Sequence, residues 1–430
     1  MDRFPVHCST TKSSHPTAEF NGSGFSGFNG SALTRQGDRA PGGSALFVLF
    51  DLNMAGSSSS SVPKVWAELV TPVDARGVLL TTHVSELVEF YATAGVDGLV
   101  VSTPSLGENS SLRSEERVEL AAAVVAAAKA VSEAKGKALS VAVVGSEAGV
   151  PTERMAAEAK KLAGVGVDAV LISIDAMRSG LAHSRKLKMK REKKRLAALA
   201  AKEGGEGGGG EASSSSGGVG AKAEVSEDEQ LKGKLLNLMM LTPRVTYGVW
   251  DSPSEPLSAE MQVWLAGSTA SRFSLWFDAS GQVGGLLDDR LVAASASSTL
   301  QLVVRNSSDL DSVLRKGPAG VCGLAAALRP DLVVWLAVHA RDAAPEKVAG
   351  LASALSTLAA VTDSAASALA LSAKYVLATA ADPEGRYSSP HVVGLNVVSR
   401  NRKAKLHPSR ARAIDRALQI IGYWLQSHDL

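Results

Sequence analysis

Cysteine is almost absent from this sequence, which has only Cys8 and Cys322 among its 430 residues. Two cysteines are too few for a disulfide framework or a cysteine-rich zinc site, and the eight histidines show no spacing typical of metal ligands. We therefore expect a protein of a reducing compartment, with no structural metal.

Long apolar runs and an excess of charge of one sign are also missing. No run approaches the roughly 20 residues that span a membrane, and the early run at 45–50 is too short for a signal-peptide core. The 45 basic and 43 acidic residues leave a net charge of +2, which argues against nucleic acid as a partner of the whole chain. The sequence predicts a cytoplasmic protein without a membrane partner.

The first 63 residues are rich in Ser, Gly and Thr and show no periodicity, so we expect a disordered or targeting tail. If residues 1–53 are a transit peptide, the compartment is a plastid or mitochondrion instead. A third interpretation is that translation begins at Met54, just before a serine run.

From residue 65 onward, short apolar runs alternate with amphipathic segments of helical period. The runs are continuous rather than alternating, as in a parallel sheet buried on both faces. The expected strands are 65–70, 98–102, 138–145, 169–174, 244–250, 273–277, 300–304 and 320–326. Eight strand–helix pairs over residues 65–343 predict an α/β protein with a (β/α)8 TIM barrel, followed by a C-terminal helical extension at 344–430. A doubly wound open sheet is the alternative.

One segment interrupts this alternation. Residues 178–228 hold the basic run HSRKLKMKREKKR and then a Gly/Ser-rich stretch, which together predict a low-complexity insertion. We expect it to be mostly disordered, apart from a helix around 185–202. The basic run is interpreted as a solvated surface arm, in preference to a nucleic acid site or a nuclear address.

Active sites of such barrels lie at the carboxyl ends of the strands. The residues expected there are Thr71, the segment 102–108, Glu147, Asp175, Trp250, Asp251, Phe277, Asp278, Arg305 and Arg329. They include no lysine, histidine or cysteine. Three of them are aspartates, Asp175, Asp251 and Asp278, which either converge to hold Mg²⁺ or cap the turns and helices that follow.

Residues 95–125, GVDGLVVSTPSLGENSSLRSEERVELAAAVV, closely resemble the second strand–helix unit of the dihydrodipicolinate synthase / N-acetylneuraminate lyase family. Pro104-Ser105-Leu106-Gly107-Glu108 is similar to that family's Gly-Thr-Thr-Gly-Glu motif, with Gly-Glu intact. The segments 67–77, 317–336 and 371–377 resemble its first strand, its eighth strand with the following helix, and part of its C-terminal helices.

The resemblance implies class I aldolase chemistry on a 2-oxo acid. In that family a lysine ending the sixth strand forms a Schiff base, a tyrosine ending the fifth strand relays protons, and the threonine pair holds the substrate carboxylate. Here Phe277 stands at the lysine position, Trp250 at the tyrosine position and Leu106 at one threonine, whereas Ser105 keeps a hydroxyl and Asp278 keeps the usual acid. Phenylalanine has no amine with which to form an imine.

The resemblance therefore predicts a divergent member and a pseudoenzyme, with no residue assigned as catalytic and no cofactor. The alternative is an active lyase, or a carboxylate- or Mg²⁺-dependent enzyme with altered chemistry at the barrel mouth. A small 2-oxo acid is the expected ligand, and the family implies a homo-oligomer. The substrate-binding positions that it implies are Ser105, Leu106, Gly107, Glu108, Trp250, Asp251, Phe277 and Asp278.

Overall fold

The computed structural model describes residues 62–145, 149–203, 225–251, 255–267, 272–278, 285–363, 368–379, 392, 395–400 and 404–428. The chain divides into two units, 1–57 and 58–430. The first unit, which holds most of the expected N-terminal tail, lies outside the described residues.

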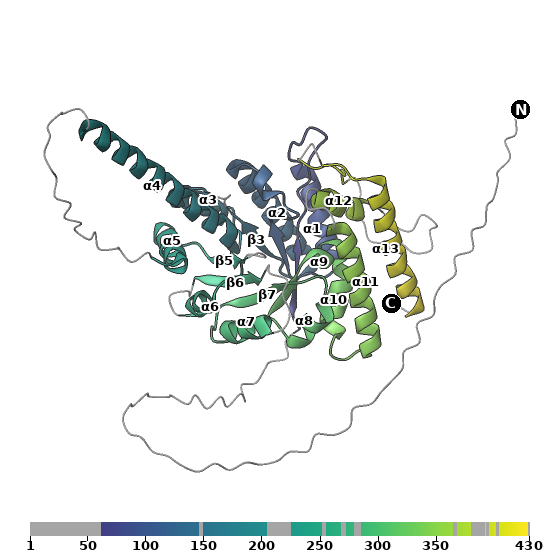
Figure 1. Cartoon of the computed structure of the whole chain (residues 1–430). Coiled ribbons are helices and arrows are strands. Elements are labelled where there is room, and N and C mark those ends of the chain that lie inside the picture. Colours follow the sequence, from purple (N-terminus) through teal and green to yellow (C-terminus); the bar gives the residue numbers. More distant parts are fainter. Residues whose placement is uncertain are drawn as a thin grey trace, which may run out of the picture. The chain divides into compact units, whose positions relative to one another are not determined.

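Eight parallel strands close into a barrel in sequence order, and β1 also pairs with β8 (Figure 1). The strands are β1 (Lys64–Glu68), β2 (Gly98–Val101), β3 (Ser140–Val144), β4 (Ala169–Ser173), β5 (Tyr247–Trp250), β6 (Phe273–Asp278), β7 (Gln301–Arg305) and β8 (Gly320–Cys322). This confirms the (β/α)8 barrel expected from the sequence and excludes the open sheet.

Helices surround the strands and continue beyond them (Figure 1). The helices that alternate with the strands are α1 (Val84–Thr93), α2 (Ser114–Lys135), α3 (Thr152–Gly164), α4 (Ile174–Glu203), α5 (Glu227–Leu241), α6 (Ala259–Ala266), α7 (Gly285–Ser295) and α8 (Leu310–Lys316). After β8 come α9 (Leu324–Leu328), α10 (Pro330–His339), α11 (Pro345–Asp363), α12 (Leu369–Ala378) and α13 (Pro408–Ser427). Helices α11 and α13 pack side by side, and this confirms the C-terminal helical extension.

The eighth strand is shorter than the sequence suggested, because the expected strand 320–326 ends at Cys322. Gly323 follows with a φ of 136°, a conformation that favours glycine, and the chain then enters the short helix α9. The alanine- and leucine-rich segment 324–328 has high helix propensity, which corrects the strand expected over these residues.

Helix α4 begins directly at the end of β4 and contains the basic run at 183–195. From Lys186 to Ala198 its side chains are exposed, and α4 extends away from the barrel (Figure 1). The Gly/Ser-rich part of the expected insertion, 204–224, lies outside the described residues. Among the helices of the described residues, none combines the length and apolar character that crossing a membrane requires.

Large aromatic side chains fill the barrel interior. Trp66 of β1 points inward and is 3% exposed, and it needs glycine on the neighbouring strand. A Cβ built at Gly98, the register partner of Trp66 on β2, would lie 2.4 Å from the indole ring. The inward orientation of Trp66 on β1 and the lack of a side chain at Gly98 on β2 together allow the indole to lie close to the barrel axis.

Candidate functional site

An aromatic cluster occupies the place where the strands β1, β5 and β6 reach the barrel mouth. Phe277 of β6 is fully buried; its ring is stacked on Trp250 of β5 with centroids 5.5 Å apart, and it meets Trp66 edge-on at 5.4 Å. Such pairs add to the burial of the rings themselves. Two of the predicted site residues, Trp250 and Phe277, are therefore brought together, as packing partners inside the barrel.

A buried ion pair lies next to this cluster and joins the ends of β1 and β7. Oε1 of Glu68 accepts a hydrogen bond of 2.7 Å from Nε of Arg305, and its other oxygen accepts one from the hydroxyl of Ser105. Burial raises the pKa of Glu68, but the charge of Arg305 and the hydrogen bonds outweigh it, so the pKa lies below its usual range. Glu68 is thus held as a carboxylate in the barrel mouth.

Sequence reasoning missed Glu68. The expected strand 65–70 placed the strand end at Thr71, whereas β1 ends three residues earlier, at Glu68. A single acid in the apolar run VWAELV was the available signal, because a buried carboxylate needs a partner. The hydroxyl of Ser105, one of the predicted substrate-binding residues, donates to the carboxylate of Glu68.

Two of the three predicted aspartates do converge, around a basic side chain. Asp251 at the end of β5 and Asp278 at the end of β6 are fully buried and both pair with Arg290 of α7. Nη2 of Arg290 lies 3.0 Å from Oδ2 of Asp251, and Oδ1 of Asp251 also accepts the backbone N–H of Leu257. The guanidinium further lies over Trp276, 5.6 Å from its ring centre. A positive charge thus already occupies the space between these carboxylates.

The third aspartate, Asp175, lies in the first turn of α4 and is partly exposed. No group of three or more His, Cys, Asp or Glu side chains in the described part of the chain could hold a metal ion.

Cys322 ends β8 beside the Glu68–Arg305 pair. Burial, followed by the charge of Glu68, raises the pKa of its thiol well above the usual value. Glu147 lies outside the described residues.

The Gly-Glu part of the strand-end motif anchors the C-terminal segment 395–400 onto the barrel. The carboxylate of Glu108 binds Nζ of Lys374 at 3.0 Å and the hydroxyl of Ser399 at 2.6 Å, and it also accepts the backbone N–H of Arg400. Glu108 itself adopts a left-handed conformation with φ of 49°. Through these contacts Glu108, a predicted site residue, joins the loop after β2 to α12 and to the segment 395–400.

The two residues before Glu108 are also packed against the barrel. Leu106 is fully buried. A Cβ at Gly107 would lie 2.2 Å from the backbone nitrogen of Thr103, so the loop closes only with glycine there. The carbonyl of Gly107 accepts a 2.7 Å hydrogen bond from the hydroxyl of Thr71, the residue expected at the first strand end. These residues shape the loop after β2.

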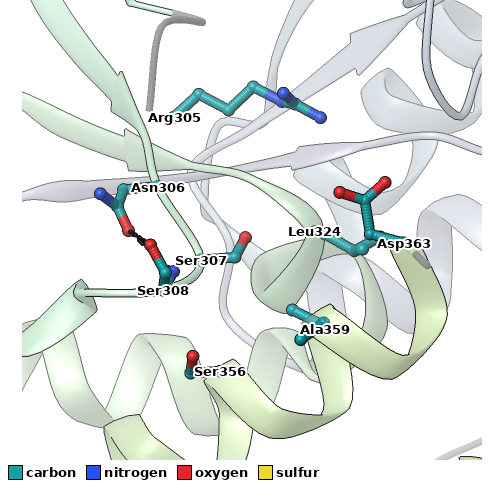
Figure 2. Close-up of a pocket in the computed structure, with 9 residues that line it drawn as sticks. Arg305, Asn306, Ser307, Ser308, Leu324, Ser356, Ala359 and Asp363 are labelled. Carbon is teal, nitrogen blue, oxygen red and sulfur yellow. Dashed lines mark hydrogen bonds between the residues drawn. The ribbon is translucent and has the colours of Figure 1, made fainter. Parts of the chain in front are cut away.

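A polar pocket of about 270 Å³ opens beside the barrel mouth, between the loop after β7, the start of α9 and one face of α11 (Figure 2). Arg305 enters it from the end of β7 and Asp363 from the end of α11. The other lining residues are Asn306, Ser307, Ser308, Leu324, Ser356, Ala359 and Ala360. The sequence predicted only Arg305 among these, because α11 lies outside the repeating strand–helix pattern.

Comparison with known proteins supports the resemblance stated from the sequence. Residues 61–173 match the model of the dihydrodipicolinate synthetase family. No curated protein sequence matches the chain.

The fold is shared with several solved structures. A dihydrodipicolinate synthase from Cyanidioschyzon merolae with lysine bound is 17% identical with a TM-score of 0.57, over 84% of this chain and 98% of that one. A catalytic lysine mutant of Ruminococcus gnavus sialic acid aldolase is 13% identical with a TM-score of 0.59, over 85% and 97%. YagE of E. coli K12, in complex with pyruvate, is 15% identical with a TM-score of 0.56, over 84% and 98%.

Proposed function

Starting from the chain's resemblance to the dihydrodipicolinate synthetase family, at the low identity of a divergent member, we propose that its barrel is a lyase scaffold without Schiff-base chemistry. The observation that carries the proposal is the environment of Phe277, which is fully buried between Trp66 and Trp250. An imine requires an unprotonated amine that reaches the 2-oxo acid, and this strand end presents a packed ring instead.

No lysine elsewhere in the described barrel offers a convincing substitute. Lys374 is buried, and burial lowers the pKa of its ammonium, which would favour a nucleophile. However, its Nζ donates to Glu108 and, at 2.6 Å, to the carbonyl of Val398, so the amine is engaged in holding the C-terminal segment. Lys234, whose pKa burial also lowers, lies on α5, and its Nζ packs against Gly180 of α4 rather than beside Phe277 or Trp250.

Reductive trapping tests this proposal directly. We expect the purified protein, incubated with pyruvate and borohydride, to gain no mass on any lysine, while a pyruvate-dependent aldolase treated in parallel is modified. Stoichiometric modification of a single lysine, located by peptide mass mapping, would overturn the proposal and make this protein an active aldolase. Modification of Lys374 in particular would mean that its contacts with Glu108 open in solution.

A carboxylate- or Mg²⁺-dependent enzyme is the second candidate, because Asp251 and Asp278 meet at the barrel mouth. Arg290 weakens this second candidate, because its guanidinium already compensates the charge of both carboxylates. We expect millimolar Mg²⁺ to leave the melting temperature unchanged. A clear increase that is lost in Asp278→Asn would favour this candidate, because a bound metal stabilises the folded state by mass action.

Family resemblance also leads us to propose a homo-oligomer, with a small 2-oxo acid as ligand of the barrel. Exposed apolar side chains, including Val263 of α6 and Val292 of α7, at 68% and 65% exposure, are candidates for a contact between copies. Sedimentation at micromolar concentration gives the mass directly, and a monomer under these conditions would contradict the proposal.

We propose a cytoplasmic location, on the basis of the scarcity of cysteine in the sequence. Peptide mapping of the natural N-terminus tests this. A mature chain that begins near Met54 would favour either import into an organelle or translation from that residue, and a comparison of transcripts separates those two outcomes.

A further inference from the structure

The polar pocket beside the barrel mouth is separate from the aromatic cluster that fills the barrel axis. Its walls come from the loop after β7 and from α11, and none of its lining residues belongs to that cluster (Figure 2). Its volume of about 270 Å³ leaves room for a small organic molecule.

Arg305 gives the pocket its chemical character. Its Nε is bound to Glu68, while Nη1 and Nη2 make no hydrogen bond to any residue that the structure describes. Its side chain is only 25% exposed, so these donors face a restricted space rather than bulk water. In Figure 2 the guanidinium extends toward the side of the pocket that carries Asp363. A guanidinium fork with open terminal nitrogens matches the two oxygens of a carboxylate.

The rest of the lining favours hydroxyl groups. Ser307 accepts the backbone N–H of Ala325 at 3.3 Å and keeps its own hydroxyl proton to donate, and Ser356 presents a hydroxyl from the opposite wall. The carboxylate of Asp363 can only accept hydrogen bonds, so it requires a donor on the ligand, such as a hydroxyl. Asn306 is engaged with the backbone N–H groups of Ser308 and Asp309, so it holds the loop in place.

We propose that this pocket binds a small hydroxylated carboxylic acid, with its carboxylate on Arg305 and its hydroxyls on Ser307, Ser356 and Asp363. The inference deepens the proposed function, since it names where on the same barrel an organic acid is held. Glu68 already balances the charge of Arg305, so binding depends on the geometry of the fork and the hydroxyl contacts. We therefore expect millimolar affinity, without covalent chemistry.

A second hollow of about 470 Å³ continues from the pocket along α8 and α11 and shares Ser308, Ser356 and Ala360 with it. It gives the ligand a route that does not pass over the barrel axis. Ala360 is exposed and lies where the two hollows meet, so a larger side chain there obstructs the pocket and leaves the Glu68–Arg305 pair intact.

Calorimetric titration with D-gluconate, hexanoate and pyruvate tests the inference on the full-length protein. We expect D-gluconate to bind. Pyruvate should bind more weakly, because its keto oxygen can accept from the serine hydroxyls but it has no hydroxyl for Asp363. Hexanoate, which has no polar group besides its carboxylate, should not bind. Ala360→Phe should weaken D-gluconate binding at least tenfold. Arg305→Lys, which keeps the charge beside Glu68, should weaken it about five- to tenfold by removing the fork. Ala130→Phe, the same change as at 360 on an exposed position of α2, is the matched control and should have no effect.

Equal binding of D-gluconate and hexanoate, or binding unaffected by Ala360→Phe, would overturn the inference, as would no binding at 50 mM. Failure here is distinguishable from failure of the proposed function. If pyruvate and borohydride modify the protein and D-gluconate does not bind, the proposed function and the pocket inference are both refuted. If the protein is not modified and D-gluconate does not bind, only the pocket inference is refuted. Circular dichroism confirms that each variant is folded.

Discussion

The ammonium nitrogen of Lys374 lies 3.0 Å from a carboxylate oxygen of Glu108, although 266 positions separate the two residues. Both side chains are buried, and the contact joins the loop after β2 to α12. A buried pair of this kind is not by itself a large source of stability, but loss of one partner leaves the other charge without compensation.

Removal of that lysine should therefore destabilise the protein strongly. We expect Lys374→Met to lower the free energy of unfolding by about 3–5 kcal/mol. Lys129→Met, on the exposed face of α2, should change it by no more than about 0.5 kcal/mol. Urea unfolding followed by circular dichroism measures both. Equal effects of the two changes would mean that the buried pair has no structural role.

The approach of Trp66 to Gly98 gives a second expectation. Gly98→Ala places a methyl group against the indole ring, and Trp66 cannot retreat because Phe277 meets it edge-on. We expect a loss of about 1–3 kcal/mol from overpacking. At Gly164, the last residue of α3, a Cβ meets nothing within 4 Å, so Gly164→Ala should be neutral or slightly stabilising. Denaturation midpoints compare the two.

Phe277→Lys returns an amine to the sixth strand end. We expect the variant to be less stable by about 3 kcal/mol or more, because the ring contacts with Trp66 and Trp250 are lost and an amine is buried. Burial also lowers the pKa of such an amine and favours imine formation. Pyruvate and borohydride should then modify position 277.

Turnover should remain negligible in that variant, because Trp250 and Leu106 provide neither a phenol nor a hydroxyl for proton transfer. Phe277→Leu, which restores no amine, is the control and should show no trapping. A folded Phe277→Lys protein that cannot be trapped would mean that this strand end is inaccessible to 2-oxo acids, and the barrel axis would no longer be a candidate ligand site.

Acid sensitivity should depend on Glu116 of α2. The guanidinium of Arg400 binds its carboxylate through two hydrogen bonds of 2.9 Å, and these, with the backbone N–H of Arg113, lower its pKa to about 2. A carboxyl whose pKa falls on folding contributes stability above its unfolded value, here 4.5, and loses it as the pH drops toward 2.

We therefore expect stability to fall between about pH 5 and pH 2, with a shallower decline in Glu116→Gln. Urea midpoints across this range measure the slope. Glu119→Gln, three residues further along α2 on its exposed side, should keep the original slope. Parallel profiles for the original protein and Glu116→Gln would show that Arg400 does not hold Glu116 in solution.

The sequence was sufficient for the barrel because its pattern is repetitive. Continuous apolar runs such as 98–101 and 169–173 fall on strands, and the glycines that end the preceding helices mark their starts. The end of the eighth strand is not predictable from the sequence, because leucine and alanine after Gly323 suit a buried helix as well as a buried strand.

The partners of the site residues were beyond sequence reasoning. Arg290 sits in the segment DDRL and reads as one more surface charge, yet it is fully buried between Asp251 and Asp278. Likewise, nothing local links Glu68 to Arg305, 237 positions away. Periodicity assigns residues to elements and faces, but long-range pairing depends on how barrel closure juxtaposes distant strand ends.

The C-terminal segment 395–400 also has a consequence for biosynthesis. Glu108 receives the backbone N–H of Arg400 across 292 positions, so the loop after β2 meets its partner only when nearly the whole chain has left the ribosome. Domains tend to fold from the N-terminus as synthesis proceeds. During translation, the carboxylate of Glu108 therefore stays solvated after the early strands have been synthesised. A nascent chain that ends before Ser399 would expose this loop to proteases and chaperones.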